Sequence, residues 1–292
     1  MKYDITMLGH ISRDIMIYGE EVQKFTGGPV IYSSAAAARS NKKVHVITRA
    51  SAEDDPALDV IRKEGVQVTR LDSPATTSIK NLYLSADRER REATLLSRAD
   101  SFSLADFPET DSRIYHLAGL FDDEIPDEFI PFLADKGEVG VDAQGLLRYS
   151  RGGKLDFHNW DAAEEMMPRI TYFKVDALEA EIMTGLTDRI EAAARLASLG
   201  AKEVILTHNH EVLVCTGGEV FRAPYNPSNL SGRTGRGDTT FASYMARRLD
   251  ASPRESVWYA AALCSMKMEA PGPFKGTFED VYRRMESMGY KD

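Results

Sequence analysis

The chain has 292 residues, of which 43% are hydrophobic and 28% are charged, and this composition is that of an ordinary globular α/β protein. Its formal net charge of −9 disfavours a nucleic-acid or anionic-membrane surface, so we expect neither partner. The N-terminus lacks the apolar core of a signal peptide, and no apolar run approaches the roughly 18 residues of a membrane span, which predicts a cytoplasmic protein.

The first part of the chain alternates short apolar runs with helical patterns. A proline at residue 29 marks the start of an Ala-rich helix. Strands are expected at residues 3–8, 44–48 and 66–71, and helices at residues 30–39 and 56–64. This alternation predicts β-α-β units and a mostly parallel sheet.

Two features near the first strand are candidate substrate-binding groups. Asp14 follows that strand, and the carboxyl ends of strands are where an α/β sheet exposes ligand-binding groups. It could hold substrate hydroxyls, or it could be only a turn residue. Gly27 and Gly28 precede the first helix and would let a ligand approach the backbone. An ordinary loop-to-helix junction explains this pair equally well.

Residues 76–96 are predicted to form a hairpin with a charged turn at residues 87–91, whose basic side chains we expect to be solvated. With a strand at residues 15–18, the hairpin could form a small sheet apart from the main one. We therefore expect one domain over residues 1–292 with a small β lid at about 12–26 and 76–98. The open edges of such a lid could also pair in a homodimer.

The second half of the chain continues the same alternation. Strands are expected at residues 114–120, 139–141, 170–175 and 204–207, a hairpin at 212–222, and helices at 188–200, 253–268 and 278–288. Gln144, in the segment after one of these strands, is a further candidate substrate-binding residue. Cys215 and Cys264 stand in no metal-ligand pattern, so we expect two buried thiols.

Asp176 and Glu179 stand three residues apart at a predicted helix start and would share one face there. Paired carboxylates at this spacing could hold the water shell of a magnesium ion. Alternatively, they are acidic residues that favour a helix N-terminus.

A glycine-rich loop leads into the helix whose apolar stripe contains Phe241 and Met245. Gly235 and Gly237 allow an unusual backbone, and the free amides of the helix start would favour an anion beside them. Asp238 is placed to accept a proton from a hydroxyl group near that anion, which makes it the candidate catalytic base. The alternative is that Asp238 only caps the helix.

Four motifs occur in a fixed order, and together they resemble the ribokinase-like (PfkB) carbohydrate kinase family over nearly the full length. They are Gly9 with Asp14, Gly27-Gly28, the segment KVDALEAEIMTG that begins at residue 174, and Gly235-Arg236-Gly237-Asp238. The resemblance implies a three-layer α/β/α fold with a mostly parallel central sheet and a small β lid. It also implies ATP-dependent, magnesium-dependent transfer of the γ-phosphoryl group to a hydroxyl of a sugar or related polyol.

The resemblance also implies roles for individual residues. Asp238 would be the base, and the amides of Gly235 to Gly237 would form the anion hole. Glu179, with Asp176, would organise magnesium. The candidates for the sugar hydroxyls are Asp14, Gly27 and Gly28, and those for the nucleotide side are Thr207, Asn209, Thr234, Gly235 and Gly237.

Several positions depart from the family pattern. Gly232-Arg233 replaces the usual Asp-Thr, Arg236 replaces an alanine, and residues 207–212 lack both usual glycines. Arg236 could be a built-in arginine finger or a surface bystander.

The acceptor could also be a nucleoside or a cyclitol such as inositol. A non-catalytic sugar- or nucleotide-binding descendant is the alternative outside the class. The first strand is not followed by the sequence Gly-x-Gly-x-x-Gly, which disfavours a dehydrogenase.

Overall fold

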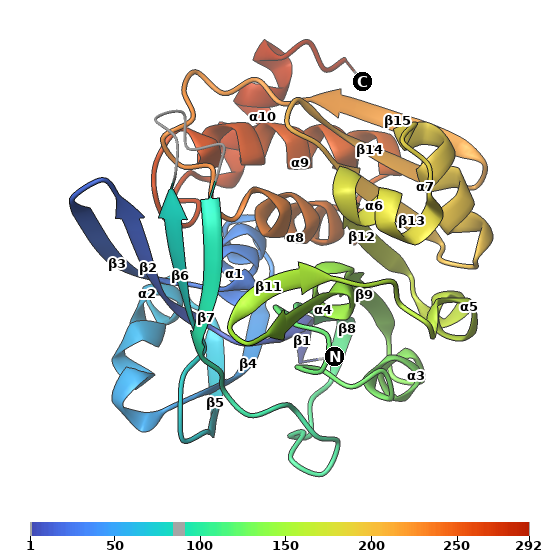
Figure 1. Ribbon diagram of the computed structural model, residues 1–292. Coiled ribbons are helices and arrows are strands. Elements are labelled where there is room, and N and C mark those ends of the chain that lie inside the picture. The colour runs from blue at the N-terminus through green and yellow to red at the C-terminus, as the bar shows by residue number, and fades with distance from the viewer. Residues whose placement is uncertain (1, 84–90, 292) are drawn as a thin grey trace.

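A nine-stranded sheet forms the centre of the computed structural model, which describes residues 2–83 and 91–291 (Figure 1). Seven neighbouring strands are parallel, and a hairpin of two strands adds an antiparallel edge. In spatial order they are β15 (Glu219–Pro224), β14 (Glu211–Thr216), β13 (Glu203–Thr207), β12 (Tyr172–Asp176), β9 (Glu138–Asp142), β8 (Ser112–Leu117), β1 (Tyr3–Leu8), β4 (Val44–Ala50) and β5 (Gln67–Asp72). Strands β4 and β13 are buried along their whole length, as expected for parallel strands covered on both faces.

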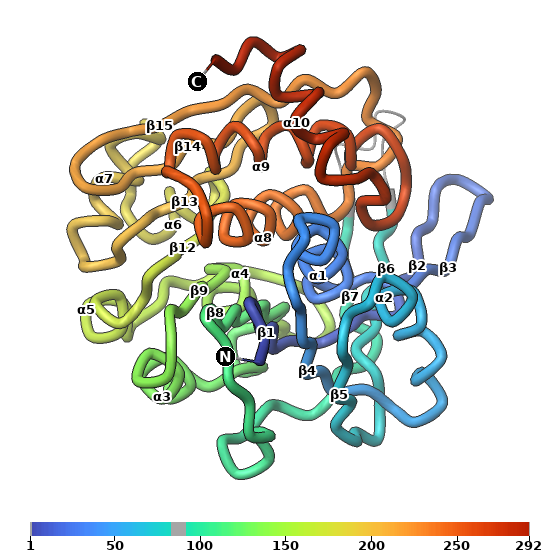
Figure 2. The backbone as a smooth tube through the Cα atoms, turned by 180° about the vertical axis from the view of Figure 1, so that it is seen from behind, coloured from blue at the N-terminus to red at the C-terminus, as the bar shows by residue number. Residues whose placement is uncertain are grey.

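Helices cover both faces of this sheet and enclose two apolar cores. One face carries α1 (Pro29–Arg39), α8 (Arg236–Arg248), α9 (Pro253–Met268) and α10 (Phe278–Ser287). The other carries α3 (Phe129–Ala134), α5 (Ala163–Met166), α6 (Ala177–Thr184) and α7 (Arg189–Ser198). Figure 2 shows α8 between α1 and α9, and it packs against both. The predicted three-layer α/β/α architecture is confirmed.

A second, six-stranded sheet stands beside the main one, and in Figure 1 it extends from the left of the molecule to its centre. Its spatial order is β10 (Arg148–Arg151), β11 (Lys154–Phe157), β7 (Arg91–Ser97), β6 (Ser78–Tyr83), β2 (Ser12–Tyr18) and β3 (Glu21–Gly27). The strands expected around 12–26 and 76–98 are therefore present. The hairpin of β10 and β11 was not predicted. Of the charged turn expected at 87–91, residues 87–90 lie outside the described residues.

Three sequence predictions need correction. The helix expected at 56–64 is a 3₁₀ helix (Ala52–Leu58) followed by the short α2 (Asp59–Arg62). Pro56 lies inside the 3₁₀ segment, where its missing N–H and its ring disfavour a continuous α-helix. Asp14 lies within β2 and not in a turn. The strand expected at 114–120 ends at Leu117, and the backbone beyond it passes close to Gly145, since a Cβ atom at Gly119 would lie 3.0 Å from the Gly145 Cα atom.

Both cysteines are free thiols inside the protein, as predicted. Among the residues that the structure describes, no helix combines the length and the apolar character needed to cross a membrane.

Candidate active site

A cavity of about 470 Å³ lies where the carboxyl ends of the main-sheet strands face the small sheet. This is the edge at which α/β sheets bind ligands. Most of the predicted site residues line it: Asp14, Gly28, Gln144, Asp176, Glu179, Thr207, Thr234, Gly235, Arg236, Gly237 and Asp238. Gly27 and Asn209 do not line the cavity, but each lies directly behind a residue that does. A side chain at Gly27 would meet the Asp14 carboxylate, and Asn209 accepts a hydrogen bond from Arg236.

The glycine-rich loop has the backbone expected of an anion site. Gly235 is the N-cap of α8 with φ 79°, and a Cβ atom there would lie 2.3 Å from the ring of Tyr32. Among the described residues, the amides of Gly235, Gly237 and Asp238 have no hydrogen-bond acceptor, whereas the Arg236 amide donates to the Arg233 carbonyl (3.2 Å). Three unsatisfied N–H groups thus converge on the start of a 13-residue helix.

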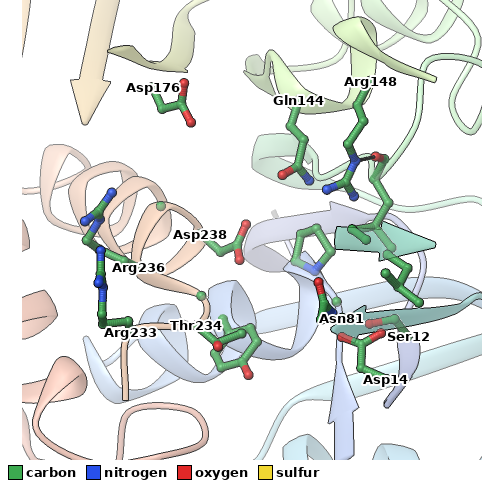
Figure 3. Close-up of a pocket in the computed structure, with 18 of the residues that line it drawn as sticks. Ser12, Asp14, Asn81, Gln144, Arg148, Asp176, Arg233, Thr234, Arg236 and Asp238 are labelled. Carbon is green, nitrogen blue, oxygen red and sulfur yellow. Dashed lines mark hydrogen bonds between the residues drawn. The ribbon is translucent and has the colours of Figure 1, made fainter. Parts of the chain in front are cut away.

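Asp238 is not the helix cap, so that alternative is wrong. It is the third residue of α8, and its carboxylate points into the centre of the cavity (Figure 3). Burial and the nearby Asp142 raise the pKa of Asp238 to about 6, and Lys174 opposes this shift. The carboxylate is therefore deprotonated at neutral pH, yet it is more basic than an aspartate in water, which suits a general base.

A buried lysine that sequence reasoning missed lies beneath the loop. Lys174 is 5% exposed, and its Nζ atom donates to Asp142 Oδ1 (3.0 Å) and lies 3.5 Å from Glu179 Oε2. A Cβ atom at Gly237 would lie 3.3 Å from this ammonium. Burial disfavours the charge, but the carboxylates raise the pKa of Lys174 well above its usual value. Its only sequence signal was its place two residues before Asp176.

Asp176 and Glu179 form a reciprocal capping box at the start of α6. Asp176 Oδ1 accepts from the Glu179 amide (2.8 Å), and Glu179 Oε2 accepts from the Asp176 amide (2.7 Å). Burial raises the pKa of Glu179 to about 8, against the effect of Lys174. The two acids therefore cap the helix and also line the cavity. No group of three or more His, Cys, Asp or Glu side chains gathers as a metal site within the described part of the chain.

The polar groups on one side of the cavity come from the small sheet and from a short helix beside the main sheet. Asp14, Asn81 and Arg148 lie on β2, β6 and β10 of the small sheet, and Gln144 begins α4 (Gln144–Leu147), which follows β9. Gln144 and Arg148 point toward Asp14 and Asn81 (Figure 3). Arg148 donates to the Leu120 carbonyl (2.8 Å) and lies over the ring of Phe121, which fixes its guanidinium. We call this the acceptor side. Asn81 and Arg148 were not predicted, because nothing in their local sequence marks them.

The opposite side of the cavity is cationic. Arg233 and Arg236 lie beside one another, across Asp238 from Gln144 and Arg148 (Figure 3). Arg236 Nη1 donates to Asn209 Oδ1 (2.9 Å), and Thr207 lines the cavity at the end of β13. We call this the donor side.

Comparisons with known proteins agree on one family. A family model described as pfkB family carbohydrate kinase matches residues 1–277. A solved pyrophosphate-dependent kinase in the ribokinase family, complexed with a pyrophosphate analog and myo-inositol, is 35% identical, covers 95% of this chain and 99% of its own, and has a TM-score of 0.87. A pyrophosphate-dependent myo-inositol-1 kinase, converted into a myo-inositol-3 kinase by mutation, is 33% identical over 98% of this chain and 100% of its own, with a TM-score of 0.87.

A more distant solved structure shares the fold. Ribokinase from Arabidopsis thaliana, complexed with ribose and ATP, is 19% identical over the full length of both chains, with a TM-score of 0.73. No curated protein matches the chain.

Proposed function

Since this chain belongs to the pfkB family of carbohydrate kinases, we propose that it transfers a phosphoryl group from inorganic pyrophosphate to a hydroxyl group of a cyclitol of the myo-inositol type. The observation that carries the choice of donor is the hydrogen bond between Arg236 and Asn209 beside the anion loop. Identity of 33% and 35% to two pyrophosphate-dependent kinases supports it.

Pyrophosphate is a small and highly charged anion, and it needs concentrated positive charge more than a long groove. Arg236 supplies a planar guanidinium that Asn209 holds in place, and Arg233 lies beside it. The hairpin between β13 and β14 is closed by the His208 amide, which donates to the Glu211 carbonyl (2.9 Å). Residues 207–212 therefore carry side chains at positions where the family pattern has two glycines, and we expect these side chains to leave less room for a nucleotide.

A cyclitol offers a ring of hydroxyl groups and no charge. The acceptor side presents one carboxylate, two amides and one guanidinium, which together donate to and accept from hydroxyl oxygens. The apolar side chains of Met16, Phe25 and Ile79 line the same side and could pack on the ring carbons. This combination of polar groups with an apolar wall is typical of a sugar or polyol site.

In the proposed reaction, a hydroxyl oxygen of the acceptor bonds to a phosphorus atom of pyrophosphate while the bridging P–O bond breaks and releases phosphate. Asp238 takes the hydroxyl proton. The amides of Gly235, Gly237 and Asp238 hold the phosphate oxygens. Catalysis is thus mainly positioning and electrostatic stabilisation.

Magnesium, when bound, would neutralise charge on the donor's oxygens. The carboxylates of Asp176 and Glu179 at the cavity wall suit this role, because magnesium keeps much of its water shell and needs few protein ligands. One oxygen of each is used in the capping box, so contact through water fits the structure.

ATP, the donor that the sequence motifs imply, is the second candidate. Thr207 and the loop amides would then bind its phosphates, and the nucleoside would lie near Asn209. The closed hairpin and the Arg236 contact are what disfavour it.

The test is a donor and acceptor panel with purified protein, magnesium, and pyrophosphate or ATP. We expect kcat/KM with pyrophosphate and myo-inositol to exceed that with ATP by about tenfold or more, and Arg236→Ala to lower kcat with pyrophosphate by about tenfold. Arg195→Ala on the exposed face of α7 is the matched control and should change nothing. Equal or better use of ATP would show that the proposed donor is wrong.

A further inference from the structure

We propose that the ammonium group of Lys267 acts as a built-in monovalent cation that holds the anion-binding loop, residues 232–238, in its binding conformation. Lys267 does not line the cavity, so it is a positioning residue that acts through the loop. The inference concerns the same site and rests on the proposed function only for its activity measurement.

The surroundings of Lys267 are those of a bound cation. It lies in the last turn of α9 and is 2% exposed. Its Nζ atom donates to the Gly232 carbonyl (2.5 Å) and to the Thr234 carbonyl, and it lies 4.9 Å from the ring centroid of Tyr32. No carboxylate among the described residues forms an ion pair with it. Carbonyl oxygens and an aromatic face are the groups that replace the water shell of potassium or ammonium ions.

A buried charge without a carboxylate partner is costly, so its position needs a reason. Burial lowers the pKa of Lys267 to about 8, and the facing groups Cys264 and Asp238 oppose this shift. Lys267 nevertheless reaches two carbonyl groups of a single loop, and its charge lies close enough to Asp238 to lower the pKa of that carboxylate. Both effects act on the anion site.

Peptide geometry explains how Lys267 orients the loop. The Thr234 carbonyl and the Gly235 amide belong to one planar trans peptide, so they point in opposite directions. A hydrogen bond from Lys267 to that carbonyl therefore turns the Gly235 N–H away from α9. Gly235 lines the cavity, and its amide has no acceptor in the described protein. The lysine thereby keeps one donor of the anion hole free for the phosphate.

The start of the loop is fixed against the same helix end. The Gly232 amide donates to the Met268 carbonyl (2.8 Å), and a Cβ atom at Gly232 would lie 1.9 Å from the Ala270 carbonyl oxygen. No larger residue fits there without a backbone shift. Gly232 therefore allows the close approach that brings its carbonyl within hydrogen-bond distance of Lys267. The two residues together hold the start of the loop against the end of α9.

The experiment replaces the cation. Lys267→Ala removes the ammonium and opens space beside the two carbonyl groups, whereas Lys267→Met fills the space without charge. At constant ionic strength in a tetramethylammonium salt, we expect kcat/KM of Lys267→Ala to be about 100-fold below that of the parent. Added potassium, ammonium or methylammonium should raise kcat/KM of this variant by about tenfold or more. Lys267→Met should be equally impaired and not restored. The parent and Lys63→Ala, an exposed lysine after α2, should not respond to the cation.

A second measurement needs no substrate. The melting temperature of Lys267→Ala should rise with potassium or ammonium concentration, because a cation that binds only the folded state stabilises it, and that of Lys267→Met should not. This result is independent of which donor or acceptor the enzyme uses.

Three outcomes would overturn the proposal. They are full activity of Lys267→Ala in tetramethylammonium, a folded Lys267→Ala protein whose activity and melting temperature ignore added cations, and a parent enzyme that itself requires potassium. The last is measured on the unmodified protein, so the proposal can be rejected even if both variants fail to fold.

Discussion

Asp238 lies between the cationic donor side and the polar acceptor side, and its environment adjusts its basicity. The carboxylate is close enough to Lys174 and Lys267 to feel both charges, while burial and Asp142 act in the opposite direction. The net result is a base that is ionised at neutral pH but holds a proton more readily than an ordinary aspartate. We therefore expect its removal to affect chemistry more than folding.

Asp238→Asn should lower kcat by roughly 10²–10⁴-fold, the usual contribution of a positioned base. Donor binding, measured by calorimetry, and the melting temperature should be retained, because the amide has the same shape and avoids a charge that burial disfavours. Asp250→Asn, at an exposed position beyond the other end of α8, is the control. Turnover within about threefold of the parent would contradict the assignment.

The same carboxylate predicts the acid side of the pH profile. Its pKa of about 6 means that Asp238 is unprotonated above pH 6 and gains a proton as the pH falls through that value. A protonated base cannot accept the hydroxyl proton, so kcat/KM should decline below about pH 6. Because one proton is involved, the decline should approach about tenfold for each pH unit. The decline should be absent from the residual activity of Asp238→Asn. A flat profile down to pH 5 in the parent would argue against a catalytic Asp238.

At the scale of elements, the junction of β12 and α6 brings together helix capping, a buried ion pair and the proposed magnesium site. The capping box fixes the start of α6, and Glu179 at the same time faces Lys174. The sequence alternatives for Asp176 and Glu179 are thus compatible, because one pair of side chains can cap a helix and line a cavity.

Glu179→Gln separates these roles. The glutamine carbonyl can still accept from the Asp176 amide, so α6 should keep its cap, but a glutamine cannot lose a proton to become a carboxylate when magnesium binds. We expect the magnesium concentration for half-maximal rate to rise several-fold, with a melting temperature close to that of the parent. Glu191→Gln in the exposed first turn of α7 should leave the titration unchanged. If the magnesium titration of Glu179→Gln matched the parent's, the pair would serve only as a cap.

At the scale of the whole molecule, the cavity exists only because two sheets face each other. The small sheet contributes Asp14 and Asn81, and the helices beside the main sheet contribute Gln144, in α4, and Asp238, in α8. A polyol that contacts both groups would draw the sheets together, which is the lid movement predicted from the sequence. The homodimer expected through the edges of the small sheet stays a prediction.

Hydrogen exchange measures this movement. Addition of the true acceptor should slow exchange in β2 and β3 and in β6 and β7 together, because all four strands belong to one sheet that closes over the ligand. Peptides from α7, on the far face of the main sheet, should exchange at the same rate with and without acceptor. Unchanged exchange in the small sheet at saturating acceptor would mean that it is a fixed wall.

The sequence by itself determined the family, the order of the main elements and the residues of the glycine-rich loop. These depend on residues close in the chain: an apolar run makes a buried strand, and glycines beside a helix start make an anion site. Family membership also confirms the predicted phosphotransferase acting on sugar or polyol hydroxyls.

Only the tertiary structure decided which polar side chains join that loop. Asn81 and Arg148 line the same side of the cavity although 67 positions of chain separate them, and Lys267 reaches Gly232 from 35 residues away. A lone lysine in an apolar helix carries no local mark of its partner, because its ammonium is stabilised by carbonyl groups that only the packing of α9 against the loop brings within reach.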